Sequence, residues 1–183
     1  MRIKNFILDR DGTIIEEKQY LKDPKEVQLL PNTTKALKIL QDRGIELFIV
    51  TNQSGIGRGY FTIEDFYNVQ SKLIRLLMEY KITIKDTLFC PHKPDDLCFC
   101  RKPRPGMWLS LREKYNLNPL ETIVVGDKIS DILFGINSKI GYNALVLTGY
   151  GKKYRQIYGD FFIDFVANDL LQLVEILDRD GYL

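Results

Sequence analysis

Two aspartates stand two residues apart in the stretch DRDGT, which follows the apolar run FIL. Side chains two apart in an extended chain point to the same side, so we expect Asp9 and Asp11 to face one site, with Gly12 allowing a sharp turn beyond them. Close carboxylates repel each other unless a cation lies between them, and Mg²⁺ prefers oxygen ligands of this kind. Asp127, at the end of another apolar run, would complete the ligand set. A carboxylate nucleophile with a second carboxyl as acid and base is a known route for displacement, whereas a surface Asp-Gly turn beside a salt bridge is the common alternative.

A second group of reactive side chains lies in CPHKPDDLCFC, which holds every cysteine of the chain and its only histidine. The pattern C-x-H-x5-C-x-C supplies three thiolates and one imidazole, the donor set of a closed tetrahedral zinc site. Isolated cysteines are usually small buried hydrophobic residues, but that explanation requires all the soft ligands to gather by chance. We therefore predict a structural Zn²⁺ ion bound by Cys90, His92, Cys98 and Cys100, which would fix the chain just before Arg101 and Lys102.

The elements that must position these residues are visible as short β-rich runs that end in small or polar residues. FIL precedes Asp9, LFIV precedes Thr51, TIVV precedes Gly126 and ALVL precedes Thr148. The runs are continuous rather than alternating, as in parallel strands covered on both faces. Predicted helices separate or follow them: residues 33–43, a helix from Thr62 with a capping box, and helices beginning near residues 105, 130 and 168. The run YGDFFIDFV is predicted to be a late strand.

This alternation predicts an α/β fold, a Rossmann-like doubly wound parallel sheet whose strand ends meet at one edge, where ligands bind. The length of 183 residues predicts a single domain over residues 1–183, with a zinc loop at 90–100. The stretches between the runs that carry Asp9, Thr51 and Lys102 are too short for a large additional domain that would cover the site. With 26 basic and 24 acidic residues, no strong field favours nucleic acid or membrane. The three clustered cysteines argue against a secreted disulfide framework, so we expect a cytoplasmic protein, and we expect a monomer.

Four runs carry a resemblance to a known family. FILDRDGT, IVTNQSG, RKPRPGM and VGDKISD resemble, in order and spacing, the motifs of the haloacid dehalogenase-like (HAD-like) phosphatases. The resemblance implies that Asp9 attacks phosphorus and forms an aspartyl phosphate, while Asp11 protonates the leaving alcohol and then deprotonates water. It implies that Thr51 and Lys102 hold the phosphoryl oxygens. It also implies that Mg²⁺ is bound by the Asp9 carboxylate, the Asp11 main-chain carbonyl and Asp127.

The loop TNQSGIGRGYF, the zinc cluster and the RKPRPGM run resemble more narrowly the D-glycero-D-manno-heptose 1,7-bisphosphate 7-phosphatases. This resemblance implies a phosphoric monoester hydrolase that removes the 7-phosphate during synthesis of activated heptose for bacterial surface polysaccharide. The short spacing between the histidine and the next cysteine resembles the related histidinol-phosphate phosphatases, which are the alternative. A nucleic-acid 3′-phosphatase is disfavoured by the near-neutral charge and the zinc cluster. A non-catalytic zinc-stabilised domain would leave the aspartates and Lys102 unexplained, and a dehalogenase would not need both Asp11 and Mg²⁺.

The expected substrate is a small phosphorylated sugar, and several polar residues are predicted to contact it. One wall would follow the candidate nucleophile, and another would follow the second motif. The resemblance further implies substrate contacts from two cations, and a bisphosphate would give a reason for them. The predicted substrate-binding residues are Glu17, Lys18, Gln19, Tyr20, Asn52, Gln53, Ser54, Arg101 and Lys128.

Overall fold

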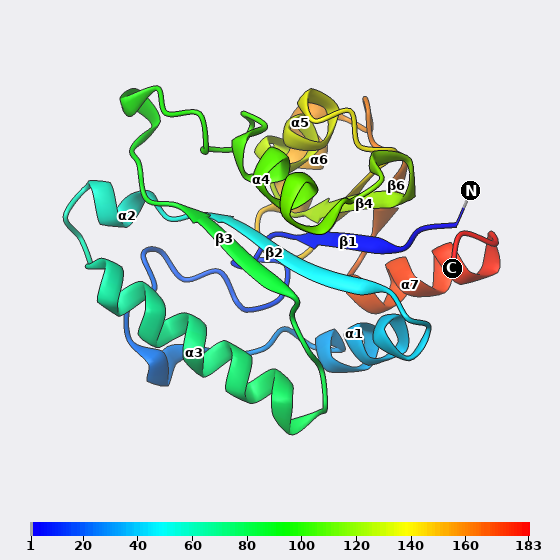
Figure 1. Cartoon of the computed structure of the whole chain (residues 1–183), viewed down its shortest axis with the longest axis horizontal. Coiled ribbons are helices and arrows are strands. Elements are labelled where there is room, and N and C mark those ends of the chain that lie inside the picture. The colour runs from blue at the N-terminus through cyan, green and yellow to red at the C-terminus, as the bar shows by residue number, and fades with distance from the viewer. Residues whose placement is uncertain (1) are drawn as a thin grey trace.

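A six-stranded sheet forms the centre of the computed structural model, which describes residues 2–183 (Figure 1). All neighbouring strands are parallel, and their order across the sheet is β3-β2-β1-β4-β5-β6. This is the strand order of a doubly wound Rossmann-like fold, so the predicted fold class is confirmed. The strands are β1 (Asn5–Leu8), β2 (Glu46–Asn52), β3 (Asp86–Cys90), β4 (Thr122–Gly126), β5 (Tyr142–Val146) and β6 (Phe165–Ala167).

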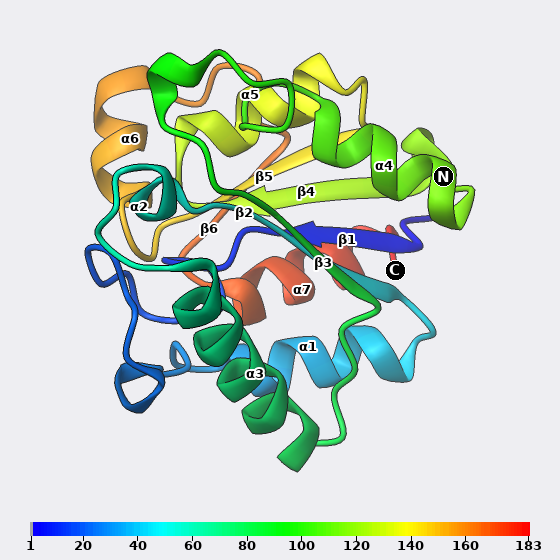
Figure 2. The same ribbon diagram turned by 60° about the vertical axis from the view of Figure 1, so that its left-hand side comes forward.

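Helices cover both faces of this sheet (Figures 1 and 2). The helices α1, α3 and α7 lie on one face, and α4 and α5 lie on the other. Three short 3-10 turns lie at Pro24–Glu26, Pro94–Asp96 and Pro119–Glu121. The helices are α1 (Thr33–Asp42), α2 (Ser54–Gly57), α3 (Ile63–Glu79), α4 (Gly106–Tyr115), α5 (Ile129–Asn137), α6 (Gly151–Tyr158) and α7 (Leu170–Arg179).

The continuous apolar runs form strands because both of their faces are buried. In β1, Phe6 and Leu8 belong to the cluster under α1, α3 and α7, whereas Ile7 belongs to the cluster with α4 and α5. Successive side chains of a strand point to opposite faces, so a strand with two buried faces has no polar positions to alternate. Trp108 of α4 is fully buried in the second cluster.

Local signals fix where the longest helix begins. Thr62 precedes α3, and its Oγ1 accepts a hydrogen bond from the backbone N of Asp65 at 3.1 Å. The Asp65 Oδ2 in turn accepts from the Thr62 backbone N at 2.7 Å, which completes the predicted capping box. The hydrogen bonds to Thr62 outweigh a smaller effect of burial and hold the pKa of Asp65 below its ordinary value.

Several elements differ from the sequence-based expectation, including the short helix α2, which was not predicted. β3 was not predicted, and it extends as far as Cys90, so the irregular insertion begins only after the first zinc-ligand candidate. α6 was not predicted either, because its sequence GKKYRQIY is mostly exposed and has no long apolar face. The predicted late strand is wrong over most of its length: β6 covers only Phe165–Ala167, and Phe161 and Phe162 are exposed.

The strand order places the candidate residues at a topological switch point. β1 pairs with β2 on one side and with β4 on the other. Asp9 follows β1, Thr51 lies near the end of β2, and Asp127 follows β4, so all three reach the same edge. Ligands of doubly wound folds bind at this place, in the crevice outside the strand ends. Among residues 2–183, no helix is both long enough and apolar enough to cross a membrane.

The free energy of unfolding should depend on apolar side chains buried against the sheet face that α1, α3 and α7 cover. Leu173 of α7 is fully buried there, and Leu173→Ala should lower the free energy of unfolding by about 2–5 kcal/mol because it leaves a cavity. Leu109→Ala is the matched control, since Leu109 is 43% exposed and should cost less than about 0.5 kcal/mol. Urea unfolding measures both. Equal losses in the two variants would contradict the assigned burial of α7.

Candidate active site

Lys102 connects three distant parts of the chain at the end of β1. Its Nζ lies 2.7 Å from Asp9 Oδ1, 2.7 Å from Asp131 Oδ1, and 2.7 Å from the backbone oxygen of Val50. Lys102 is 3% exposed, so this ammonium has almost no access to water. Burial would lower the pKa of Lys102, but the carboxylates of Asp131 and Asp9 outweigh it and raise the pKa. The lysine is therefore held as a cation beside the candidate nucleophile.

The position of Lys102 is set by its backbone as well as by its charge. The Asn52 side chain accepts from Lys102 N at 3.0 Å and donates to Lys102 O at 3.0 Å. One amide therefore fixes both polar atoms of this residue's backbone to the end of β2. Asp131 makes two contacts that support this arrangement. Its Oδ2 accepts from Lys128 N at 3.0 Å in the capping box of α5, and its other oxygen contacts Lys102.

Asp11 is held by three donors. Arg10 donates from Nε to Asp11 Oδ2 at 3.0 Å and from Nη2 to Oδ1 at 3.1 Å. The side-chain amide of Gln53 donates to Asp11 Oδ2 at 2.9 Å and to Thr51 Oγ1 at 2.8 Å. Thus Gln53, predicted as a substrate contact, also links the candidate acid/base to the threonine at the end of β2.

The predicted magnesium ligands converge on a small volume next to the Lys128 ammonium. Lys128 Nζ lies 3.3 Å from the Asp11 carbonyl oxygen, 3.6 Å from Asp127 Oδ1 and 4.0 Å from Asp9 Oδ2. Its closest partner is Glu17 Oε2, at 2.7 Å. Asp127 Oδ1 is buried and accepts no hydrogen bond from any residue between 2 and 183, whereas Asp127 Oδ2 accepts from Tyr150 N at 2.8 Å. A buried acceptor without a donor, beside two further oxygen ligands, fits a divalent cation.

Glycine is required where the chain passes this cluster. Gly12 has φ +89°, and a Cβ added there would collide with the carboxylate of Asp127. The backbone of the DRDGT turn can approach Asp127 only because this residue has no side chain. Thr148 Oγ1 donates to the Gly12 carbonyl at 2.6 Å, which ties the turn to the end of β5.

Burial and charge act in opposite directions on the carboxyl groups. Burial would raise the pKa of Asp9, but Lys102 and Lys128 outweigh it and hold the pKa below its ordinary value. Burial raises the pKa of Asp127 to about 8, and burial also raises the pKa values of Asp131 and Glu17. Asp9 is therefore the carboxylate that stays ionised, as a nucleophile must be.

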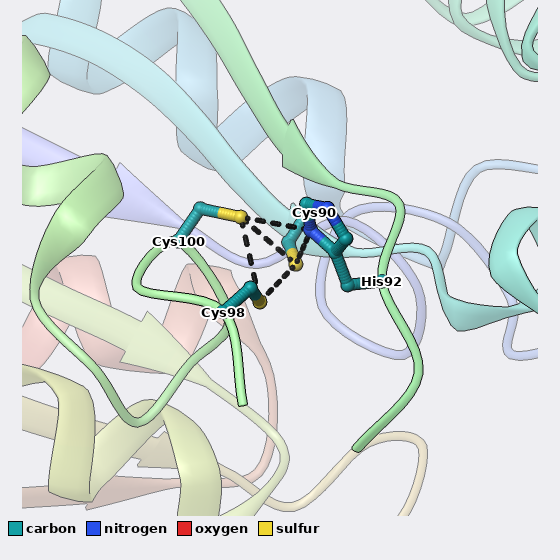
Figure 3. Close-up of side chains that lie close together, drawn as sticks. All are labelled: Cys90, His92, Cys98 and Cys100. Atoms are coloured by element: carbon teal, nitrogen blue, oxygen red, sulfur yellow. Dashed lines mark hydrogen bonds between the residues drawn. The ribbon is translucent and has the colours of Figure 1, made fainter. Parts of the chain in front are cut away.

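The four predicted zinc ligands lie together beside the end of β3 (Figure 3). The sulfur atoms of Cys90, Cys98 and Cys100 are 3.2–3.6 Å apart, and His92 Nδ1 lies 3.6 Å from Cys90 Sγ and 3.3 Å from Cys100 Sγ. A tetrahedral zinc ion with bonds of about 2.0–2.3 Å requires donor separations of roughly 3.5–3.8 Å. The donor set fits this ion, and the separations lie at the lower end of this range or slightly below it.

The loop that carries these donors is also tied to the protein by its backbone. Gln53 N donates to Cys90 O at 2.7 Å, and Gly57 N donates to Pro91 O at 2.8 Å. Arg104 donates to Cys98 O at 2.7 Å, and Arg101 Nη1 donates to His92 O at 3.4 Å. The cluster therefore lies between α2 and the segment that carries Lys102.

These groups open into a cavity of about 410 Å³. Of the predicted catalytic residues, all four line it, and Asp127 lies buried beneath. All predicted substrate contacts line it as well, although the Lys18 ammonium donates to the backbone of Glu26 at 2.7 Å. The predicted residues in the wall are Asp9, Asp11, Glu17, Lys18, Gln19, Tyr20, Thr51, Asn52, Gln53, Ser54, Arg101, Lys102 and Lys128.

Sequence analysis missed some residues of the wall and its support. Tyr150 and Tyr154 reach the cavity from α6 and the residue before it, and Lys128 Nζ lies 5.4 Å from the centre of the Tyr150 ring. Exposed tyrosines in a polar segment gave no signal of this. Arg10 was noticed only as part of the DRDGT charge pattern, because the local turn that brings it to Asp11 is not encoded in residue spacing.

Comparisons with known proteins agree with the fold and with the class of enzyme. The family model described as polynucleotide kinase 3 phosphatase matches residues 4–156. A probable D-glycero-D-manno-heptose-1,7-bisphosphate 7-phosphatase of Thermoplasma volcanium is 41% identical over 126 residues, covering 69% of this chain and 86% of the relative. The D-glycero-beta-D-manno-heptose-1,7-bisphosphate 7-phosphatase of Haemophilus influenzae is 34% identical over 182 residues, covering 96% and 97%.

A solved structure matches over almost the whole chain. The D,D-heptose 1,7-bisphosphate phosphatase of B. bronchiseptica, complexed with magnesium and phosphate, superposes with a TM-score of 0.90 at 31% identity, covering 97% of this chain and 99% of the other. The sheet order and the aspartates at its switch point define a HAD-like phosphatase, a phosphoric monoester hydrolase. Within that class, the chain belongs to the polynucleotide kinase 3 phosphatase family and to its group of D-glycero-D-manno-heptose-1,7-bisphosphate 7-phosphatases.

The raised pKa of Asp127 predicts a pH-dependent stability in magnesium-free buffer. Its pKa is about 8 in the folded chain, against an ordinary value of 3.8. Folding therefore favours the protonated form, so the contribution of Asp127 is complete at low pH and is lost as the pH rises through its folded pKa. Between about pH 4 and about pH 8, where the unfolded chain has lost this proton and the folded chain still holds it, the wild type should lose more stability than Asp127→Asn, which has no charge to bury. Urea unfolding tests this, and parallel curves for the two proteins would contradict the assignment.

Proposed function

We propose that this chain removes the 7-phosphate of D-glycero-D-manno-heptose 1,7-bisphosphate through an aspartyl-phosphate intermediate, in the synthesis of activated heptose for surface polysaccharide. The observation that carries the proposal is the contact of 2.7 Å between Lys102 Nζ and Asp9 Oδ1 at the base of a polar cavity. It joins a nucleophile candidate to a cation 93 positions away. The names of the matched relatives support the heptose substrate.

In this proposal, Asp9 attacks phosphorus in line with the leaving oxygen. The bond from Asp9 to phosphorus forms as the bond to the sugar oxygen breaks, and Asp11 gives that oxygen its proton. Asp11 then takes a proton from the water that hydrolyses the aspartyl phosphate. Thr51 and Lys102 hold the phosphoryl oxygens, on which most of the transition-state charge lies.

The donor set at Asp9, the Asp11 carbonyl and Asp127 would hold Mg²⁺, which supplies neutralisation of the phosphoryl charge when bound. Burial of Asp127 and its unpaired oxygen support this assignment. Lys128 lies close to the same oxygens, and the phosphate of an incoming substrate offers its ammonium another partner. Arg101 and Lys128, which both line the cavity, supply surplus positive charge for a bisphosphate.

A structural zinc ion is the second proposed metal. The three thiolates and His92 would use all four positions of a tetrahedral ion, so no position is open for substrate. Its effect on catalysis would be indirect: it fixes the chain at Cys100, two residues before Lys102.

Two measurements test the function. Phosphate release should show the highest kcat/KM with heptose 1,7-bisphosphate, assayed as both anomers, and a much lower value with histidinol phosphate. A preference for histidinol phosphate would replace the proposed substrate without affecting the assigned chemistry.

Asp9→Asn tests the chemistry itself. The amide is a poor nucleophile, so kcat should fall by at least about 10⁴-fold while the circular dichroism spectrum stays unchanged. Asp169→Asn is the matched control, because Asp169 caps α7 and asparagine also caps helices, so its turnover should equal that of the wild type. Phosphate release by Asp9→Asn at the wild-type rate would refute the nucleophile.

Removal of one candidate zinc ligand tests whether the zinc loop positions Lys102 for catalysis. Cys98→Ser should reduce bound zinc from one ion per chain and lower kcat/KM, because the loop before Lys102 loses its cross-link. Phe99→Ser changes the adjacent residue, which is 61% exposed and offers no metal donor, so it should retain zinc and activity. Metal analysis and kinetics measure both variants. Full activity in zinc-free Cys98→Ser would disprove the role of the ion.

A further inference from the structure

Arg10 is a fully buried arginine that the proposed chemistry does not yet use. It is 1% exposed, it does not line the cavity, and its guanidinium binds the carboxylate of the next residue. In an extended chain its side chain would point away from Asp11. The turn after β1 brings it back, and the Arg10 carbonyl accepts hydrogen bonds from Ile14 N at 2.9 Å and Ile15 N at 3.1 Å in that turn.

The guanidinium is fixed from its other side by α3. Its Cζ lies 5.3 Å from the centre of the Phe66 ring, within the range of a cation–π contact. Phe66 is 1% exposed and packs against Phe89 of β3 with ring centres 4.1 Å apart. Arg10 therefore has little freedom to follow Asp11 if that carboxylate moves.

The hydrogen bonds leave one free direction on Asp11. An ionised carboxylate has about four acceptor positions. Arg10 uses one on each oxygen, and Gln53 uses a second on Oδ2. The remaining position is on Oδ1, and Asp11 lines the cavity. The three donors thus leave Oδ1 as the oxygen of Asp11 that can give a proton to the substrate or take one from water.

This arrangement is a poor source of stability. Buried ion pairs often stabilise a protein no more than apolar residues of similar volume would. Moreover, Arg10 Nη1 is buried and finds no hydrogen-bond partner within the part of the chain that the structure describes. An arginine kept here at such a cost is better explained by what it does to Asp11.

We propose that Arg10 is the positioning residue of the acid/base Asp11: its fork holds the carboxylate so that Oδ1 meets the leaving oxygen. The inference rests on the proposed function, in which Asp11 protonates that oxygen as the bond to phosphorus breaks. Arg10 touches neither substrate nor the reacting atoms, so its loss should lower kcat with little effect on KM.

The leaving group provides the decisive test. A sugar alkoxide needs a proton to leave, whereas p-nitrophenolate leaves without one, and kcat/KM reports only the steps up to that departure. Arg10→Met should lower kcat/KM by about 10²-fold or more for the sugar phosphate, the loss expected when general acid catalysis fails. For p-nitrophenyl phosphate the loss should be less than about threefold. Arg10→Lys keeps the charge but not the fork, and should show the same split in smaller degree.

Arg43→Met is the matched control, because Arg43 makes a two-point contact with Asp178 on the surface and neither residue lines the cavity. It should change neither substrate's kcat/KM. Equal losses on both substrates in the Arg10 variants would mean a structural role only and would overturn the proposal, as would unchanged turnover of the sugar phosphate. If Arg10→Met does not fold, Arg10→Lys carries the test.

The two levels of inference fail differently. Should the wild type hydrolyse some other alkyl phosphate instead of heptose bisphosphate, the proposed substrate is wrong, and the same comparison with that alkyl phosphate still decides the role of Arg10. Suppose instead that the wild type is highly active on heptose bisphosphate, but the Arg10 variants lose the same fraction of kcat/KM on both substrates. Then the proposed function stands and only the positioning role of Arg10 is wrong.

Discussion

The Lys102 ammonium, buried between Asp9 and Asp131, is the interaction on which the site depends. Removing either charge from a buried pair typically costs about 3–5 kcal/mol because the other is left unpaired, whereas the intact group gains little for the fold. What it does provide is order: β1, the segment before α4 and the start of α5 must meet at one point. The same cation, together with Lys128, keeps Asp9 ionised despite its burial, so the Lys102 contact contributes to both the geometry and the charge state of the candidate nucleophile.

The candidate zinc cluster and the Asn52 amide lie on either side of Lys102 and hold its buried ammonium in place. Lys102 follows a segment with only one 3-10 turn of its own, and a buried charge on a mobile loop would not be held reliably. Four metal donors close the loop on one side of Lys102, and two hydrogen bonds from Asn52 fix its backbone on the other. With the proposed zinc ion bound, the distance from the loop to Asp9 would be set by the metal geometry and by the end of β2.

Sequence analysis predicted what depends on strand ends and donor chemistry. Asp9, Thr51 and Asp127 meet because parallel strands place their carboxyl ends at one edge, whatever the length between them. The clustering of the four candidate zinc ligands was predictable because few residue types bind this metal. β3 was missed because DTLFC is short, half-buried and at the sheet edge, and α6 because its surface is polar. The Arg10 fork and the Asp131 contact depend on side-chain rotamers in a tight turn and at a helix start, which residue spacing does not encode.

Opposing charges are arranged here so that each aspartate has a different environment. Asp9 contacts cations and stays ionised; Asp127 is buried with one oxygen unpaired and is protonated more readily; Asp11 is held by a guanidinium and an amide. These environments fit the roles proposed for Asp9 in attack, for Asp127 in metal binding and for Asp11 in proton transfer. Since these differences arise from Lys102, from depth of burial and from Arg10, the specificity of each role lies in its neighbours and not in the aspartates themselves.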